Sequence, residues 1–382
     1  MNAEPVPSPA TILCVVGARP NFMKIAPVMA ALAACPGLRG YLVHTGQHYD
    51  VAMSAGFFAE LGIPEPDENL EVGSGSHAQQ TAEVMRRFEP VLDRVRPAAV
   101  LVVGDVNSTI ACALVAVKKG IAVAHVEAGL RSWNRAMPEE INRVLTDQIS
   151  DFLFTTEQGA LPNLLREGIA AERVHFVGNV MIDTLRANLA RATPPRQSLI
   201  EAGAAPGLAE DPRGYQVLTL HRPSNVDDRA VLSGLLTTVR DISARCPVVF
   251  TVHPRTRARI AEFGLDRLLG GPDIAVIPPQ GYLAMLGLMA GARAVLTDSG
   301  GIQEETTALG VPCFTLREDT ERPITIEEGT NTLVGPAPAA ILAAFDRLLA
   351  TGGKTGRIPA LWDGRAAERI AGVLAGAFVH PD

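Results

Sequence analysis

Short runs of apolar residues alternate along the chain with longer stretches in which apolar positions recur at helical spacing. The short runs of the first half lie at 11–17, 41–46, 98–105, 121–129, 152–156 and 174–179, and those of the second half lie at 215–221, 248–254, 274–279, 292–298 and 311–316. Nearly continuous apolar runs are typical of strands in a parallel sheet that helices cover on both faces. The alternation therefore predicts an α/β fold built from βαβ units.

A segment rich in Pro, Gly and Ala, at 192–214, separates the two series of strands and has the composition of a linker. The chain has 382 residues, which is more than one hydrophobic core usually supports. We therefore expect two doubly wound, Rossmann-like domains that face a cleft. Residues 1–180 form the first domain in this prediction, and residues 181–364 form the second.

Charge and cysteine content narrow the class of protein. The formal net charge of −7 argues against nucleic acid as a partner. The five cysteines are scattered and form no C-x-x-C pair, which is typical of free thiols in a reducing compartment. The first ten residues, MNAEPVPSPA, have no signal-peptide character, and no apolar run approaches the roughly 20 residues of a membrane helix. We expect a cytoplasmic enzyme or binding protein without a membrane partner.

Polar residues follow nearly every predicted strand, and ligands of doubly wound folds bind at these strand ends. The segments are GARPNFMK (17–24), HTGQHYD (44–50), GDVNST (104–109), HVEAGLRS (125–132), HRPSNVD (221–227), HPRTR (253–257), PPQGYLAM (278–285), TDSGGIQEET (297–306) and LREDTERP (316–323). So many polar ends indicate a ligand site, because turn chemistry alone would not require them all.

Charged residues at three of these ends raise specific expectations. Arg19 and Lys24 stand at a helix start, where cations oppose the helix dipole, so contact with an anion is expected. Asp105 either caps the following helix or acts in catalysis. Glu127 ends an apolar strand and needs a partner or a function, and Arg131 is the structural partner that we expect for it.

The loop at 297–306 combines two glycines at a helix start with three acidic residues. Glycines there let backbone N–H groups approach a phosphate, whereas carboxylates repel one. The glycines and the carboxylates therefore point to different ligand groups, and the loop alone does not say which ligand carries both. Asp298 and Glu304 have no assigned ligand, and capping, packing or surface charge remain open for them.

Resident cofactors and metals find little support in the sequence. The segment GSGSHA (73–78) matches the G-x-G-x-x-A pattern of dinucleotide sites, but it follows a poor strand and is not at the first βα turn. No Walker A motif is present, and Asp298 alone does not make a magnesium site. We expect no cofactor and no metal.

Taken together and in order, the motifs from GARPNFMKIAP (17–27) to EEGTNTLVG (327–335) resemble the non-hydrolysing UDP-N-acetylglucosamine 2-epimerases over nearly the whole chain. The resemblance implies a GT-B-like fold of two domains, with the last helix, 365–382, returning to the N-terminal domain. It implies a homodimer whose substrate is a UDP-sugar. It also implies reversible epimerisation at C2 of the sugar, for the synthesis of cell-surface polysaccharide precursors.

The same resemblance implies roles for particular residues. Asp105, Glu127 and Glu139 match the acid/base carboxylates, and His221 matches the histidine near the diphosphate. The implied substrate contacts are Arg19, Lys24, Gln280, Met285, Ser299, Gly300, Gly301, Glu305 and Arg322. A second, activating substrate site would involve Gln47, His221 and Arg222. The chain departs from the family at Met285, where some members have Phe, and in HRPSNVD (221–227), which borders the sugar and the activator site.

The chemistry of such a reaction suits these residues. The C2 hydrogen is not acidic, so elimination of UDP to 2-acetamidoglucal, followed by re-addition, replaces direct epimerisation. Protons must move on both faces of C2, which requires more than one acid/base group. Three alternatives stay open: an epimerase for a UDP-2,3-diacetamido-uronic acid, a GT-B glycosyltransferase using a UDP-sugar, and a catalytically silent sensor of nucleotide-sugars.

Overall fold

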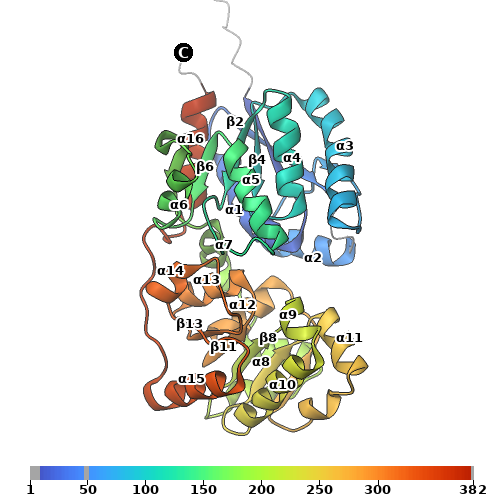
Figure 1. Cartoon of the computed structure of the whole chain (residues 1–382), viewed down its shortest axis with the longest axis vertical. Coiled ribbons are helices and arrows are strands. Elements are labelled where there is room, and N and C mark those ends of the chain that lie inside the picture. Colours follow the sequence, from blue (N-terminus) through green and yellow to red (C-terminus); the bar gives the residue numbers. More distant parts are fainter. Residues whose placement is uncertain (1–8, 47–50, 380–382) are drawn as a thin grey trace, which may run out of the picture. The chain divides into compact units, whose positions relative to one another are not determined.

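The chain divides into two compact units, each built around its own parallel sheet (Figure 1). The computed structural model describes residues 9–46 and 51–379, and for residues 51–55 it describes the backbone alone. Unit 1 comprises Met1–Thr184 and Ala360–Asp382, and unit 2 comprises Leu185–Pro359. In sequence, unit 2 is therefore inserted between two parts of unit 1.

Unit 1 contains a seven-stranded sheet in the order β3-β2-β1-β4-β5-β6-β7. Its strands are β1 (Ala10–Val16), β2 (Leu38–His44), β3 (Glu68–Asn69), β4 (Ala99–Val103), β5 (Ala122–Val126), β6 (Phe152–Thr155) and β7 (Val174–Phe176). All neighbouring strands run parallel. Every residue of the apolar strand β4 is buried, as expected for the centre of a sheet with helices on both faces.

The helices of unit 1 follow the strands in the expected alternation. They are α1 (Arg19–Ala34), α2 (Val51–Leu61), α3 (His77–Val95), α4 (Asn107–Lys118), α5 (Pro138–Ile149), α6 (Ala160–Arg166), the 3₁₀ turn η1 (Ala171–Arg173) and α16 (Ala366–Phe378). A further helix, α7 (Val180–Asn188), crosses from unit 1 into unit 2.

The C-terminal helix α16 belongs to unit 1 and packs against α1 (Figure 1). The Asp183 carboxylate accepts hydrogen bonds from the first two backbone N–H groups of α16, those of Ala366 (3.1 Å) and Ala367 (2.7 Å). The indole Nε1–H of the buried Trp362 donates to the carbonyl of Thr156 (2.9 Å). These bonds fix the returning segment at the start of its helix.

Unit 2 contains a six-stranded parallel sheet in the order β10-β9-β8-β11-β12-β13. Its strands are β8 (Gln216–Thr219), β9 (Val248–Thr251), β10 (Ile274–Ile277), β11 (Ala294–Thr297), β12 (Cys313–Thr315) and β13 (Asn331–Leu333). Its helices are α8 (Pro195–Glu201), α9 (Pro223–Val226), α10 (Arg229–Ser243), α11 (Pro254–Glu262), α12 (Tyr282–Ala290), α13 (Gly300–Leu309), α14 (Pro323–Glu327) and α15 (Pro338–Thr351), with 3₁₀ turns η2 (Leu189–Arg191), η3 (Pro206–Glu210) and η4 (Asp266–Leu269).

The predicted α/β class with two series of parallel strands is confirmed. The glycine-containing segment 73–78 proves to be a helix start at the edge of the first sheet. There the side chain of Ser76 caps α3 by accepting from the backbone N–H of Gln79 (3.3 Å). In the described ranges, none of the helices is both long and apolar enough to cross a membrane.

Candidate functional site

In unit 1, the turns after β1, β4 and β5 lie side by side because these strands are neighbours in the sheet. Asp105 follows β4 and Glu127 follows β5, whereas Lys24 lies on α1, the helix that begins after the β1 turn. The sequence separates these residues widely, but the strand order brings their turns to one edge.

Lys24 and Glu127 form a buried ion pair at this edge. Glu127 has a φ of +76°, in the left-handed region that disfavours side chains, and its backbone N–H donates to the Phe154 carbonyl (3.0 Å). Such a backbone costs about 1–3 kcal/mol and persists only where the surroundings enforce it. The expectation that Arg131 pairs with Glu127 is wrong, because the Arg131 guanidinium is bound to Asp147 (2.7 Å).

The backbone at Gly104 makes room for this ion pair. Its φ is +66°, and a Cβ placed there would lie 2.8 Å from Nζ of Lys24. The positive φ therefore favours glycine, and an added Cβ would also displace the Lys24 ammonium group. Asn21 braces the neighbouring turns, since it accepts from the Gly17 N–H (3.1 Å) and donates to the Val103 carbonyl (3.1 Å).

Asp105 is joined to helix α5 through Arg143. The guanidinium of Arg143 bridges Asp105, which is partly exposed, and Glu140 (2.7 Å), which is buried. Glu140 also accepts from the backbone N–H groups of Ser132 (3.0 Å) and Trp133 (2.9 Å). Burial acts to raise the pKa of Glu140, but these hydrogen bonds and the charge of Arg143 outweigh it and hold the pKa below its usual range.

Glu139 differs from the other two predicted carboxylates in its setting. It lies half-buried in the first turn of α5, where a negative charge suits the helix dipole. Within the described part of the chain, its side chain forms no ion pair. The three carboxylates of unit 1 thus have three different environments.

Beneath these turns lies a buried charge network that the sequence reasoning missed. His125 is fully buried, with Nδ1 2.7 Å from the Asp147 carboxylate and Nε2 2.8 Å from the Gly104 carbonyl oxygen. Asp147 also accepts from the Gly129 N–H (3.1 Å) and pairs with Arg131. Because His125 contacts the Gly104 carbonyl, the network fixes the turn that carries Asp105. A histidine inside an apolar strand was the available signal.

In unit 2, His221 lies just after β8, beside the end of β11. Nδ1 of its ring is 2.7 Å from the Asp298 carboxylate, which is completely buried. Burial acts to raise the pKa of Asp298. The side chain of His221 and the backbone N–H groups of Arg222 and His221 outweigh burial and hold the pKa below its usual value. Asp298 is therefore held as a carboxylate.

The glycine loop of unit 2 forms the start of α13. Ser299 is the N-cap residue, but its side chain makes no capping hydrogen bond, and Gly300 and Gly301 form the first turn. A Cβ at Gly300 would lie 2.6 Å from Oε1 of Glu321, so an added side chain would displace that buried carboxylate, which is paired with Arg317 (2.8 Å). Backbone N–H groups at such a helix start are suited to binding a phosphate.

Arg322 and Glu305, two predicted substrate contacts, are both buried in unit 2. Nε of Arg322 is 2.9 Å from the carboxylate of Glu304, for which the sequence leaves capping, packing or surface charge open. Glu305 neighbours Tyr282, and burial together with the Glu305 charge raises the pKa of that tyrosine. Glu304 is thus a packing and charge partner of Arg322.

The remaining predicted residues make other contacts or lie outside the described chain. Arg19 places its guanidinium over the ring of Phe57, 4.3 Å from the centroid. The Gln280 amide donates to the Pro278 carbonyl (2.8 Å), and Met285 packs against an apolar cluster of unit 2. Gln47 lies outside the described residues.

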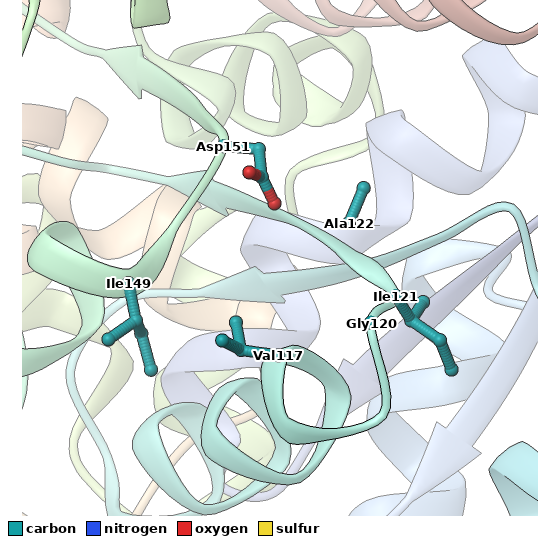
Figure 2. A pocket seen from close by; sticks show the side chains of 6 residues that line it. All are labelled: Val117, Gly120, Ile121, Ala122, Ile149 and Asp151. Atoms are coloured by element: carbon teal, nitrogen blue, oxygen red, sulfur yellow. The ribbon is translucent and has the colours of Figure 1, made fainter.

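Unit 1 is also hollowed at the opposite end of its sheet (Figure 2). The hollow is lined by Val117, Gly120, Ile121, Ala122, Ile149 and Asp151, at the amino ends of β5 and β6. Its one carboxylate, that of Asp151, accepts from the Val123 backbone N–H (2.9 Å). None of the predicted site residues lines it.

Known proteins resemble this chain along nearly its whole length. The family model described as UDP-N-acetylglucosamine 2-epimerase matches residues 30–375. The UDP-N-acetylglucosamine 2-epimerase of Methanocaldococcus jannaschii is 42% identical over 363 residues, which cover 94% of this chain and 97% of that protein. The UDP-2,3-diacetamido-2,3-dideoxy-D-glucuronate 2-epimerase of Pseudomonas aeruginosa is also 42% identical, over 371 residues that cover 95% of this chain and 99% of the relative.

A solved structure supports the same grouping. The crystal structure of the Methanocaldococcus jannaschii enzyme in complex with UDP-GlcNAc and UDP matches with a TM-score of 0.87 at 40% identity. The match covers 96% of this chain and 99% of that one, which confirms the predicted GT-B-like, two-domain fold. Since these matches span both units, the chain belongs to the non-hydrolysing UDP-N-acetylglucosamine 2-epimerase family.

Proposed function

We propose that this protein catalyses the reversible epimerisation of UDP-N-acetylglucosamine at C2, giving UDP-N-acetylmannosamine. The observation that carries the proposal is the set of three carboxylates in unit 1, each in a different environment, within a chain that belongs to this family. The reaction runs by elimination of UDP, which leaves 2-acetamidoglucal, and by re-addition of UDP with protonation of C2 on the opposite face.

The carboxylates of unit 1 carry the proton transfers in this proposal. Glu127 is paired with the buried cation of Lys24, Asp105 with Arg143, and Glu139 with no cation among the described residues. Carboxyl groups in different environments differ in proton affinity, which is what separate acid and base roles require. A group on each face of C2 then moves the proton.

Unit 2 binds UDP in this proposal. The diphosphate lies at the start of α13, against the backbone of Ser299, Gly300 and Gly301, and Glu305 accepts hydrogen bonds from the ribose hydroxyls. Gln280 and Met285 lie near the uracil. The negative charge that UDP gains on leaving is stabilised by Arg19, His221 and Arg322.

We propose a homodimer formed through an apolar surface of unit 1, here called the α5/α6 surface. It comprises the exposed side chains of Trp133, Ile141, Leu145, Leu161 and Leu165. The side chain of Gln148 on α5 donates to the Glu167 carbonyl just after α6 (3.0 Å), so the two helices are neighbours. Clustered large apolar side chains are typical of surfaces that bind another protein.

A second, activating substrate site and a cytoplasmic location complete the proposal. Arg222, which follows His221, and Gln47 would contact the activating substrate.

Four of the five free cysteines are buried, and burial raises the pKa of Cys313 to about 12, so this thiol is inert. Such thiols suit a reducing compartment.

Incubation with UDP-N-acetylglucosamine in D₂O, without added metal or NAD and followed by proton NMR, tests the activity. The manno epimer should appear, with deuterium at C2 in both epimers. Epimerisation without deuterium at C2 would contradict elimination. Turnover only after addition of an acceptor sugar would indicate a glycosyltransferase instead.

A second candidate substrate is favoured by one observation. The relative from Pseudomonas aeruginosa, named as a diacetamido-glucuronate epimerase, is as similar to this chain as the archaeal UDP-N-acetylglucosamine enzyme. Parallel assays with both UDP-sugars decide between them through the ratio of kcat/KM. A ratio that favours the uronate by tenfold or more would replace the substrate proposed above while leaving the chemistry unchanged.

A further inference from the structure

The Asp298 carboxylate accepts hydrogen bonds from several groups of unit 2. It is completely buried at the end of β11 and accepts from the backbone N–H groups of His221 (3.1 and 3.0 Å to its two oxygens) and Arg222 (2.9 Å). The Asn225 amide also donates to it (3.1 Å). A buried carboxylate with several N–H donors is held ionised and in one orientation.

The ring of His221 completes the shell around this carboxylate. Its Nδ1 lies 2.7 Å from Oδ1 of Asp298, whereas the Arg222 and Asn225 donors both contact Oδ2. An ionised carboxylate can only accept, so Nδ1 must carry a hydrogen. Among the described residues, Nε2 of the same ring makes no hydrogen bond, and the side chain is 38% exposed.

We propose that Asp298 is a positioning residue that acts through His221. It keeps the hydrogen on Nδ1, fixes the plane of the ring, and stabilises the doubly protonated imidazolium in which Nε2–H also donates. Resting on the proposed function, the role of that Nε2–H is to donate to an oxygen of the departing diphosphate. Asp298 itself does not touch the substrate.

The requirement for a particular protonation state makes this role specific. A neutral His221 ring with its hydrogen on Nδ1 presents Nε2 as an acceptor, which a diphosphate oxygen would repel. The imidazolium presents a donor instead, and the buried Asp298 charge stabilises that form as the carboxylate does in catalytic triads. The other titratable ring nearby is His253, 5.9 Å away between centroids, which offers no negative charge.

A purely structural role for Asp298 can be distinguished from the positioning role by a control variant. In that case the carboxylate would only fasten the turn at 221–226 through its bonds to backbone N–H groups and Asn225. Asn225 also donates to the Leu316 carbonyl (2.9 Å), so Asn225→Ala loosens the same turn without removing the contact between Asp298 and the ring. This substitution is therefore the matched control.

The protonation state is measured directly by NMR on the full-length protein with ring-¹⁵N histidine, using His221→Gln to assign the signal. In the wild-type protein, Nδ1 should be protonated without ligand, and both ring nitrogens should be protonated when UDP is bound. In Asp298→Asn, the amide nitrogen replaces Oδ1 and donates to Nδ1, so the hydrogen moves to Nε2. A wild-type ring with its hydrogen on Nε2 alone overturns the proposal.

Kinetics supply the second test. Asp298→Asn should lower kcat by about tenfold, because a neutral Nε2–H then replaces the charged imidazolium as the donor to the diphosphate. The double variant with His221→Gln should be no slower than His221→Gln alone, because Asp298 acts only through the ring that His221→Gln already removes. Asn225→Ala should lower Tm as Asp298→Asn does, yet keep kcat within about threefold. Additive losses in the double variant, or an equal loss in Asn225→Ala, overturn the proposal.

The two proposals fail in different ways. If the protein turns over neither UDP-sugar, the proposed function is wrong, whereas the ring spectrum and its response to UDP still decide what Asp298 does. If the protein epimerises the sugar but the wild-type spectrum shows the other tautomer, the function stands and the positioning role is wrong.

Discussion

At the scale of single residues, the unit 1 site is built from charges that other charges hold in place. Lys24 and Glu127 are both buried, and burying two charges costs several kcal/mol that their attraction only partly returns. Glu127 also has a strained backbone. A pair with this cost contributes little to stability, so we infer that it serves to hold the Glu127 carboxylate in one place.

Removing one member of this pair should therefore be far worse than removing both. We expect Lys24→Met to lower the free energy of unfolding by about 3–5 kcal/mol, because it leaves a buried carboxylate without its cation. The double variant Lys24→Met with Glu127→Gln should recover most of that loss. Urea unfolding of the three proteins measures it, and a double variant less stable than Lys24→Met would contradict this account.

The stability that Glu140 contributes should depend on pH. Its pKa is lowered in the folded protein, so the stability that it contributes is complete above its ordinary value of 4.5 and is lost as the pH falls through the folded value. Glu140→Gln should cost about 2 kcal/mol at pH 7, because hydrogen bonds to a charged group are lost. The difference from wild type should shrink below about pH 4. Unfolding curves at pH 7 and pH 3 measure this, and an equal difference at both would refute it.

At the scale of elements, the start of α13 shows how crowding by a neighbouring side chain can favour glycine over alanine in a helix. In a helix, alanine is favoured over glycine by about 1 kcal/mol. At Gly300 a Cβ would meet Oε1 of the buried Glu321 at 2.6 Å, and this crowding outweighs the gain. The residue therefore keeps the backbone N–H groups of the first turn open.

We expect Gly300→Ala to weaken UDP binding by about tenfold or more, since the added methyl group displaces Glu321 and obstructs the helix start. Gly372→Ala in α16 is the matched control, because a Cβ there meets nothing within 4 Å. The control should raise stability by up to about 1 kcal/mol and leave UDP binding unchanged. Isothermal titration with UDP distinguishes the two, and equal affinity for Gly300→Ala would show that the phosphate lies elsewhere.

Strand order explains what the sequence could predict and what it could not. Apolar runs predicted the central strands, and polar residues after them predicted where chemistry gathers. The partners were not predictable from runs alone, because Asp298 meets His221 only once β11 is known to pair with β8. The same holds for Lys24, whose contact with Glu127 depends on β1, β4 and β5 being adjacent. Arg131 is close to Glu127 in sequence, but its guanidinium binds Asp147 on α5, which the strand runs alone do not predict.

At the scale of the whole molecule, the α5/α6 surface governs assembly in our proposal. Leu145→Glu should convert a dimer of twice 40.4 kDa into a monomer, because it places a charge on the apolar contact. Ile200→Glu, on an exposed position of α8 in unit 2, is the control and should leave the dimer intact. Light scattering after size-exclusion chromatography measures the mass. A wild-type monomer, or a dimer that survives Leu145→Glu, would exclude this surface.

The return of α16 to unit 1 has a consequence for how the protein is made. During synthesis, residues 185–359 leave the ribosome as one continuous stretch, so unit 2 is the first unit whose chain is complete. Unit 1 is begun earlier but must wait for the last helix to cover α1. The two units are thus completed in the reverse of the order in which their synthesis begins, and the carboxylates proposed for catalysis stand in the unit that is completed second.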